Sequence, residues 1–83
     1  MDLLYFAWVR ERIGTGHEQV DPPAEVASVG ELIAWLAQRS PGHAEAFAEP
    51  SRLRAAIDQR FVPLETPLGN PREIAIFPPV TGG

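Results

Sequence analysis

Residues 28–36 read SVGELIAWL, and this stretch predicts the main helix around which the fold is organised. Ser28 and Glu31 have the spacing of a capping box, in which the hydroxyl and the carboxylate each bond a backbone amide that the helix leaves unpaired. The apolar residues that follow recur at spacings of three and four and therefore share one broad face. They are Leu32, Ile33, Trp35 and Leu36. We expect this face to pack on a sheet and the helix to end near Ser40, before Pro41.

The residues before this helix predict two strands. Residues 3–9 read LLYFAWV, a dense apolar run with aromatic and β-branched members that indicates a buried first strand. Residues 9–13 place two apolar side chains four positions apart with charges between them, which is consistent with one short helical turn ended by Gly14. Residues 17–20 predict a second strand, antiparallel to the first and ended by the prolines that follow.

The residues after the main helix predict a second, weaker helix over residues 42–48 and then more strands. Residues 53–57 and 61–64 flank a tight turn and are typical of a hairpin, although Gln59 stands where such turns usually have glycine. Residues 72–77 predict a last apolar strand, which the two prolines after it end.

The element order, ββαββ with an extra helix, predicts an α+β fold. One main helix packs on a mixed sheet of four to five strands, and the first and last strands pair at its centre. A chain of 83 residues that is 45% hydrophobic fits one compact domain, and without cysteine its core has no disulfide to hold it. We expect a single domain over residues 1–78 and a flexible, extended tail over residues 79–83.

Composition excludes several classes of function. A formal charge of −4 argues against a nucleic-acid backbone as the main partner, because that binding requires clustered positive charge. No run approaches the roughly 20 apolar residues that span a bilayer, and no secretory signal is visible, so we expect a soluble cytoplasmic protein. All seven cations are arginine. A lysine-free chain offers no ε-amine for a Schiff base, although a GC-rich genome would also favour arginine.

Conventional catalytic groups find little support in the sequence. His17 and His43 lie in different segments with no neighbouring serine or cysteine nucleophile, which argues against a hydrolytic triad. The carboxylates are scattered and lack the spacing of a calcium or zinc site, so we expect no bound metal. The chain is therefore not expected to be an enzyme by itself.

The last residues, PPVTGG, offer a different reactive group. Pro78 and Pro79 fix their backbone angles and supply no amide donor, so the last strand cannot continue its pairing. Gly82 and Gly83 have no Cβ and can enter a pocket too narrow for a side chain, where the carboxylate of Gly83 would meet a partner's active site. The alternative is a frayed end, since small residues are common at termini.

Four features together resemble the small sulfur-carrier subunits of molybdopterin synthase, the MoaD family. They are the ending FPPVTGG, the opening FAWVRE of residues 6–11 followed by Gly14, the Ser28 and Glu31 helix start, and Asp58-Gln59 before a hairpin. The resemblance spans nearly the whole chain. It implies a ubiquitin-like β-grasp fold, in agreement with the element order.

The resemblance also implies a mechanism. An E1-like adenylyltransferase (MoeB type) uses ATP to adenylate Gly83, and a donor such as a cysteine desulfurase system converts the adenylate into a thiocarboxylate. The tail then donates this sulfur to cyclic pyranopterin monophosphate inside the large subunit of molybdopterin synthase (MoaE type). The chain is a sulfur-carrying cosubstrate that binds no cofactor. The inserted tail comprises Pro79, Val80, Thr81, Gly82 and Gly83.

The family positions map the partner interface onto Phe6, Phe61 and Phe77, with Arg10 as a polar contact. From the sequence, Phe6 and Phe77 lie on apolar strands and are as consistent with the core as with the surface, whereas Phe61 is the better surface candidate. Two other functions remain open. Gly83 of a ubiquitin-like modifier would be conjugated to protein amines, and a thiamine-pathway sulfur carrier would share the Gly-Gly ending.

Overall fold

The computed structural model describes residues 1–79 of the chain, so residues 80–83 of the predicted tail lie outside the described part. Four strands, three helices and a 3-10 turn precede the last strand. In chain order the elements are β1 (Asp2–Tyr5), α1 (Ala7–Ile13), β2 (His17–Gln19), α2 (Val29–Leu36), α3 (Pro41–Ala46), η1 (Pro50–Arg52), β3 (Arg54–Ile57), β4 (Arg60–Val62) and β5 (Glu73–Phe77).

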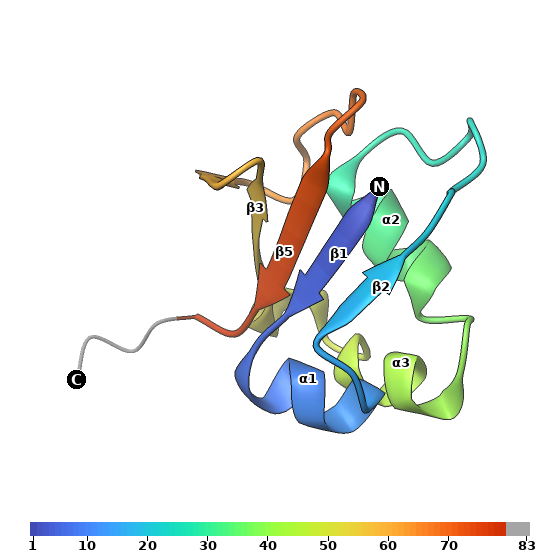
Figure 1. The fold of residues 1–83 in the computed structure, drawn as a ribbon, viewed down its shortest axis with the longest axis vertical. Helices are drawn as coiled ribbons and strands as arrows, with labels where there is room; N and C mark the ends of the chain where they lie inside the picture. Colours follow the sequence, from blue (N-terminus) through green and yellow to red (C-terminus); the bar gives the residue numbers. More distant parts are fainter. Residues whose placement is uncertain (80–83) are drawn as a thin grey trace.

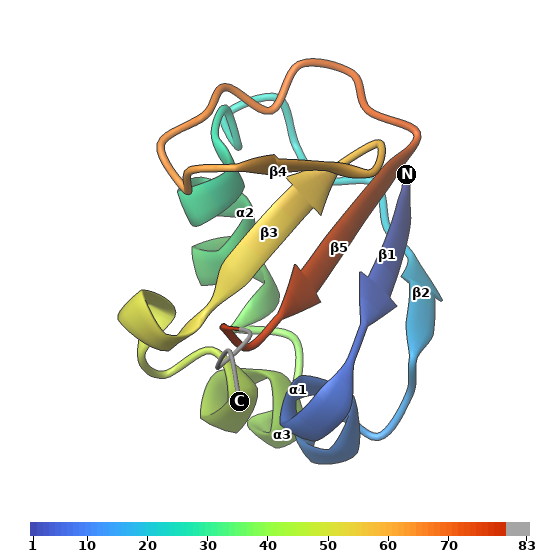
Figure 2. The same cartoon turned by 90° about the vertical axis from the view of Figure 1, so that its left-hand side faces the viewer.

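The five strands form one mixed sheet in the order β2-β1-β5-β3-β4. β1 and β5 are parallel neighbours at its centre, and the other pairs are antiparallel. The prediction that the first and last strands pair centrally is therefore confirmed. Figures 1 and 2 show α2 against one face of the sheet, and α1 and α3 at the end toward which β5 runs. This is a ubiquitin-like α+β arrangement.

Alternation along the strands divides the sheet into a core face and an uncovered face. In β5 the buried Ile74 and Ile76 alternate with the partly buried Ala75 and Phe77. The register pairs Leu3 with Ile74, so the buried side chains of neighbouring strands meet on the same face. The core residues of α2 and the strands form one cluster. The opposite face of the sheet is not covered by α2 and is available for contact with another molecule.

Helix α2 begins at the predicted Ser28 cap, whose Oγ accepts a hydrogen bond from the amide of Glu31 at 3.1 Å, but the reciprocal bond from the Ser28 amide to the Glu31 carboxylate is not formed. The helix ends at Leu36 rather than near Ser40, because its last turn tightens. The amide of Arg39 bonds the carbonyl of Leu36, three residues back, at 3.0 Å. Ser40 is then extended, as a residue before proline prefers, and caps the next helix.

The predicted first strand over residues 3–9 is too long, since β1 ends at Tyr5. Phe6 caps α1, and Ala7 turns the chain through a positive φ of 54°. An apolar run does not distinguish a strand from a buried helix, and here the helix places Val9 in the core. Gly14, at φ 97°, ends α1 as predicted, and its amide bonds the carbonyl of Arg10 at 2.9 Å.

The β3–β4 hairpin is confirmed, and its turn has an unusual composition. Asp58 and Gln59 both have positive φ, 46° and 73°, which is the type I′ pattern that usually selects glycine. The Asp58 carboxylate accepts hydrogen bonds from the amides of Arg72 and Glu73 at 3.1 and 3.0 Å. These bonds tie the turn to the start of β5 and hold the hairpin beside it.

Helices α1 and α3 approach each other closely at Gly42. A Cβ at this position would collide with the carbonyl oxygen of Arg12, so the contact requires glycine even though its φ is ordinary. None of the helices among residues 1–79 has the length and apolar character needed to cross a bilayer.

Candidate functional site

The uncovered face of the sheet carries an apolar groove beside β5. The register places Phe61 opposite Ala56 and Ala56 opposite Ala75, so three strands contribute to one surface. The groove has a volume of about 650 Å³. The described residues that line it are Phe6, Ala7, Ala56, Gln59, Phe61, Ala75, Phe77, Pro78 and Pro79. Since none of these residues carries a charge, the groove suits an apolar partner surface.

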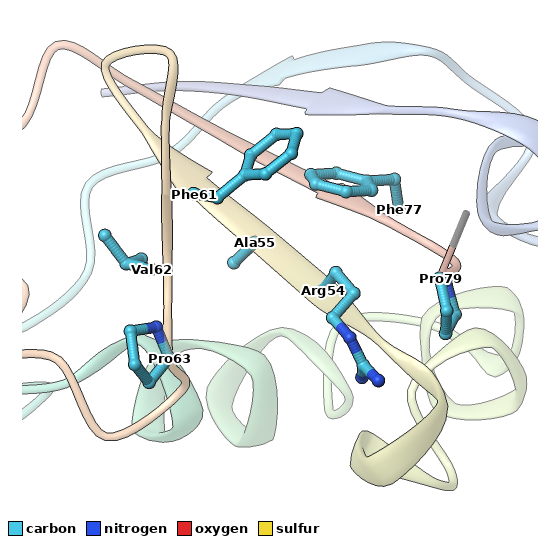
Figure 3. Close-up of a pocket in the computed structure, with 7 residues that line it drawn as sticks. All are labelled: Arg54, Ala55, Phe61, Val62, Pro63, Phe77 and Pro79. Carbon is cyan, nitrogen blue, oxygen red and sulfur yellow. The ribbon is translucent and has the colours of Figure 1, made fainter. Parts of the chain in front are cut away.

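Two phenylalanine rings form the centre of this surface. Phe61 is 80% exposed on the edge strand β4. Its ring centroid lies 5.5 Å from that of Phe77, with the rings tilted by 46°. Figure 3 shows the two rings side by side above β3. An aromatic ring as exposed as that of Phe61, lying beside a second ring, is typical of a protein contact site.

The question left open for Phe6 and Phe77 is settled by the fold. Phe6 is 48% exposed and is not on a strand, because it caps α1. Phe77 is half-buried, since its alternate position in β5 turns it to the uncovered face. Both side chains line the same groove as Phe61. Three phenylalanines far apart in the sequence therefore share one surface.

Arg10 lies one helical turn after Phe6, and its amide donates a hydrogen bond to the carbonyl of Phe6 at 3.4 Å. It is exposed on α1, and its side chain passes over Gly16, where an added Cβ would lie 3.2 Å from the Arg10 Nε. Arg10 is not among the described residues that line the groove. Arg10 thus lies outside the groove that the three phenylalanines share.

A second groove of about 550 Å³ continues the first around Phe77 and Pro79. It contains Arg54, the first residue of β3, which pairs with Phe77 in the sheet. Pro79, the last described residue, is half-buried and lines both grooves. The chain therefore leaves the domain directly beside the apolar surface. The predicted tail residues Val80, Thr81, Gly82 and Gly83 lie outside the described residues.

A buried polar cluster lies on the opposite side of the sheet. The carboxylate of Glu18 accepts a hydrogen bond from the Tyr5 hydroxyl at 2.8 Å, and its Oε2 lies 2.6 Å from the Nε2 of His43. The other ring nitrogen of His43 is 2.7 Å from the Oγ of Ser40. Arg39 adds a weaker ion pair to Glu18 at 3.9 Å. Sequence reasoning missed this cluster, including the serine that neighbours His43.

Ser40, His43 and Glu18 are connected in the same sequence as the residues of a hydrolytic triad, but here their role is structural. The His43 side chain is only 8% exposed. The Ser40 Oγ accepts a hydrogen bond from the amide of His43 and so caps the N-terminus of α3. Burial and the hydrogen bond to Glu18 raise the pKa of Tyr5 far above its ordinary value. Burial alone would raise the pKa of Glu18, but the hydrogen bonds from His43 and Tyr5 outweigh it and hold this pKa below its ordinary value. The network fastens β2 to α3.

Metal-binding groups are not gathered in the described part of the chain. Within residues 1–79, no three histidine, aspartate or glutamate side chains come together as a metal site would require. Every buried side-chain nitrogen or oxygen there has a hydrogen-bond partner, so none is left pointing toward a ligand.

Comparison with known proteins gives a consistent answer. The ThiS family profile matches residues 3–83. Molybdopterin synthase sulfur carrier subunits of Haemophilus influenzae and Escherichia coli are 40% and 41% identical to the chain. They cover 100% and 98% of it, and the chain covers 99% and 96% of them. A solved Pyrococcus furiosus structure titled molybdopterin converting factor, subunit 1, is 27% identical, with a TM-score of 0.74 over 95% of each chain.

Proposed function

We propose, because this chain belongs to the ThiS family and to its molybdopterin synthase sulfur carrier subunits, that it carries sulfur on the carboxylate of Gly83. The role of sulfur carrier follows from that membership. The observation that supports a docking tail is the position of Pro79, which lines both grooves and precedes Val80-Thr81-Gly82-Gly83. Four extended residues reach at most about 14 Å, so a partner on the grooves lies within reach of the tail.

Activation of the carboxylate comes first in this proposal. A carboxylate is a poor electrophile, because its oxygen is a poor leaving group. An E1-like adenylyltransferase (MoeB type) joins the Gly83 carboxylate to the α-phosphate of ATP and releases pyrophosphate. A persulfide of a donor such as a cysteine desulfurase system then attacks the acyl carbon and displaces AMP, and a second thiol reduces the resulting acyl disulfide and is itself oxidised to a disulfide. The product is a C-terminal thiocarboxylate.

Sulfur transfer takes place in the large subunit of molybdopterin synthase (MoaE type). The glycines let the thiocarboxylate enter a narrow active site, and its sulfur attacks cyclic pyranopterin monophosphate. Two such deliveries supply the two sulfurs of the dithiolene. Water then cleaves the acyl–sulfur bond, which leaves the sulfur on the pterin and restores the Gly83 carboxylate, and the spent carrier dissociates and is reactivated.

The chain acts in this scheme as a cosubstrate and not as the catalyst. The large subunit supplies the catalytic groups, ATP is used by the activating enzyme, and the carrier retains no cofactor. We place these reactions in the cytoplasm. The apolar groove with Phe6, Phe61 and Phe77 is the surface that the large subunit covers. Its aromatic content resembles the centre of a protein interface.

Removal of Gly83 tests the role of the terminus. The truncated chain keeps every described element, so its circular dichroism spectrum and melting temperature are expected to match those of the full chain. Molybdopterin formation in a mixture of purified carrier, activating enzyme, sulfur donor and large subunit is expected to vanish. Full activity of the truncated chain would refute the proposal. The full chain without ATP is the matched control for background transfer.

A further inference from the structure

The side chain of Arg54 lies at the edge of the apolar surface and is held in place by backbone carbonyls. Its Nη1 donates to the carbonyl oxygen of Leu53 at 2.8 Å and to that of Ser51 at 3.3 Å. Both acceptors lie at the end of the 3-10 turn η1. The guanidinium has five N–H donors, so two carbonyls engage only part of it. Arg54 is therefore an exposed cation that is held by two carbonyls and still has N–H donors available for a partner.

Arg54 forms no ion pair with the described residues, although Glu65 lines a neighbouring groove together with it. Among residues 1–79, no carboxylate oxygen lies within 4.0 Å of its nitrogens. The other described residues of its groove are Ala55, Phe61, Val62, Pro63, Phe77 and Pro79. Figure 3 shows the guanidinium turned away from the two phenyl rings. Arg54 is therefore the one charged side chain among the described residues that line the groove around Phe61 and Phe77.

A partner that covers this surface also removes water from Arg54. A buried cation without a counter-charge is strongly destabilising, so the complex requires an acceptor at this position. A carboxylate is the best match, because the planar guanidinium binds its two oxygens through parallel hydrogen bonds. The chain as a whole carries a charge of −4 and repels acidic proteins at long range. The local cation therefore fixes where on this face an acidic group can dock.

We propose that Arg54 is a specificity-determining contact that pairs with an aspartate or glutamate of the docking partner. That carboxylate is flanked by apolar side chains, which pack on Phe61 and Phe77. The inference rests on the proposed function, since it identifies the partner as the large subunit that receives the tail. It adds a charged contact that the three phenylalanines and Arg10 do not provide.

Binding measurements on four variants of the full chain test this pairing. The dissociation constant and association rate with the purified large subunit are measured at low and high salt for the wild type, Arg54→Gln, Arg54→Lys and Arg54→Glu. Arg54→Gln is expected to bind about tenfold more weakly or worse, and Arg54→Glu more weakly still. Arg54→Lys retains the charge but not the planar fork, so it is expected to fall between the wild type and Arg54→Gln.

Salt dependence separates charge pairing from a merely structural role. Wild-type affinity is expected to fall as salt rises, and Arg54→Gln is expected to lose part of that dependence. Arg72→Gln is the matched control, because Arg72 is exposed at the other end of β5 and lines neither groove. Its affinity and salt dependence are expected to equal those of the wild type. Melting curves confirm that each variant is folded before binding is compared.

Three outcomes would overturn the inference. Unchanged affinity and salt dependence in Arg54→Gln, with the wild type still bound, would remove Arg54 from the interface and leave the proposed function intact. Failure of the wild type to bind the large subunit would overturn the proposed function and this inference with it. Concentration-dependent self-association of the wild type, lost in Arg54→Glu, would show that a second copy of this chain covers the groove instead.

Discussion

The Nε2 of His43 lies 2.6 Å from the Oε2 of Glu18, and this contact joins α3 to the edge strand β2 across 25 positions of sequence. Tyr5 bonds the same carboxylate oxygen from the central strand β1. One carboxylate thus connects an edge strand, a central strand and a helix. Its ionised form stabilises the fold, because the folded state holds the pKa of Glu18 below its ordinary value.

Stability is expected to depend on pH at both extremes for this reason. A lowered pKa means that the contribution of Glu18 is complete above its ordinary value of about 4.5 and is lost as the pH falls through the folded value. The raised pKa of Tyr5 has the opposite sign, so its contribution is complete below about 10 and is lost as the pH rises further. Melting temperatures measured across the pH range test both the loss of stability at acid pH and the loss at alkaline pH.

The substitution Glu18→Gln tests the loss of stability at acid pH. It is expected to lower the free energy of unfolding at neutral pH by about 1–3 kcal/mol and to flatten the decline below pH 4.5. Glu45→Gln is the control, because Glu45 is exposed and its surface ion pair with Arg12, at 4.0 Å, contributes little to stability. An unchanged melting temperature in Glu18→Gln would contradict the structural role of the cluster.

Gly42→Ala is expected to destabilise the protein although alanine favours helices. A Cβ would meet the carbonyl oxygen of Arg12, so α1 and α3 must separate at a cost of about 1–3 kcal/mol. Helix propensity alone predicts a gain of about 1 kcal/mol, which makes the sign of the change decisive. Denaturant unfolding measures it. Gly30→Ala in α2 is the control, because its Cβ would lie 3.4 Å from the Leu64 carbonyl oxygen, an ordinary contact, and the substitution is expected to keep a propensity gain of up to about 1 kcal/mol. Equal stability of both variants would refute the close approach.

Phe61→Ala is expected to weaken binding to the large subunit much more than it weakens the fold. Phe61 is 80% exposed, and its loss removes only the contact with Phe77, worth less than about 1.5 kcal/mol. Affinity is expected to fall about tenfold or more. Phe47→Ala is the opposite control, because Phe47 is 3% exposed and its truncation costs about 3–5 kcal/mol of stability. An equal loss of binding and of stability in Phe61→Ala would show that Phe61 has a structural role instead.

The sequence predicted those features that depend on local chemistry. The Ser28 cap, the Gly14 end of α1 and the hairpin around Asp58 are each encoded within a few residues. The end of β1 was mispredicted, because the apolar run that includes Phe6 satisfies a strand and a helix equally. The hairpin formed without glycine, because the Asp58 carboxylate bonds the start of β5.

The candidate site was predicted in part. The exposure of Phe77 depends on which face of the sheet the helices cover, which is decided by long-range pairing, and that of Phe6 depends on where β1 ends. The Glu18, His43 and Ser40 cluster joins distant segments and has no local signal beyond the serine three residues before the histidine. Arg54 could not be singled out among seven arginines until the register placed it beside Phe77.

The most direct test of the central claim is the intact mass of the chain after incubation with the E1-like adenylyltransferase, ATP and a sulfur source. The proposed function predicts a mass increase equal to the replacement of one oxygen by one sulfur, located at Gly83 by fragmentation and absent without ATP. A chain that keeps its original mass, or one found only in isopeptide conjugates with other proteins, would contradict the sulfur-carrier mechanism.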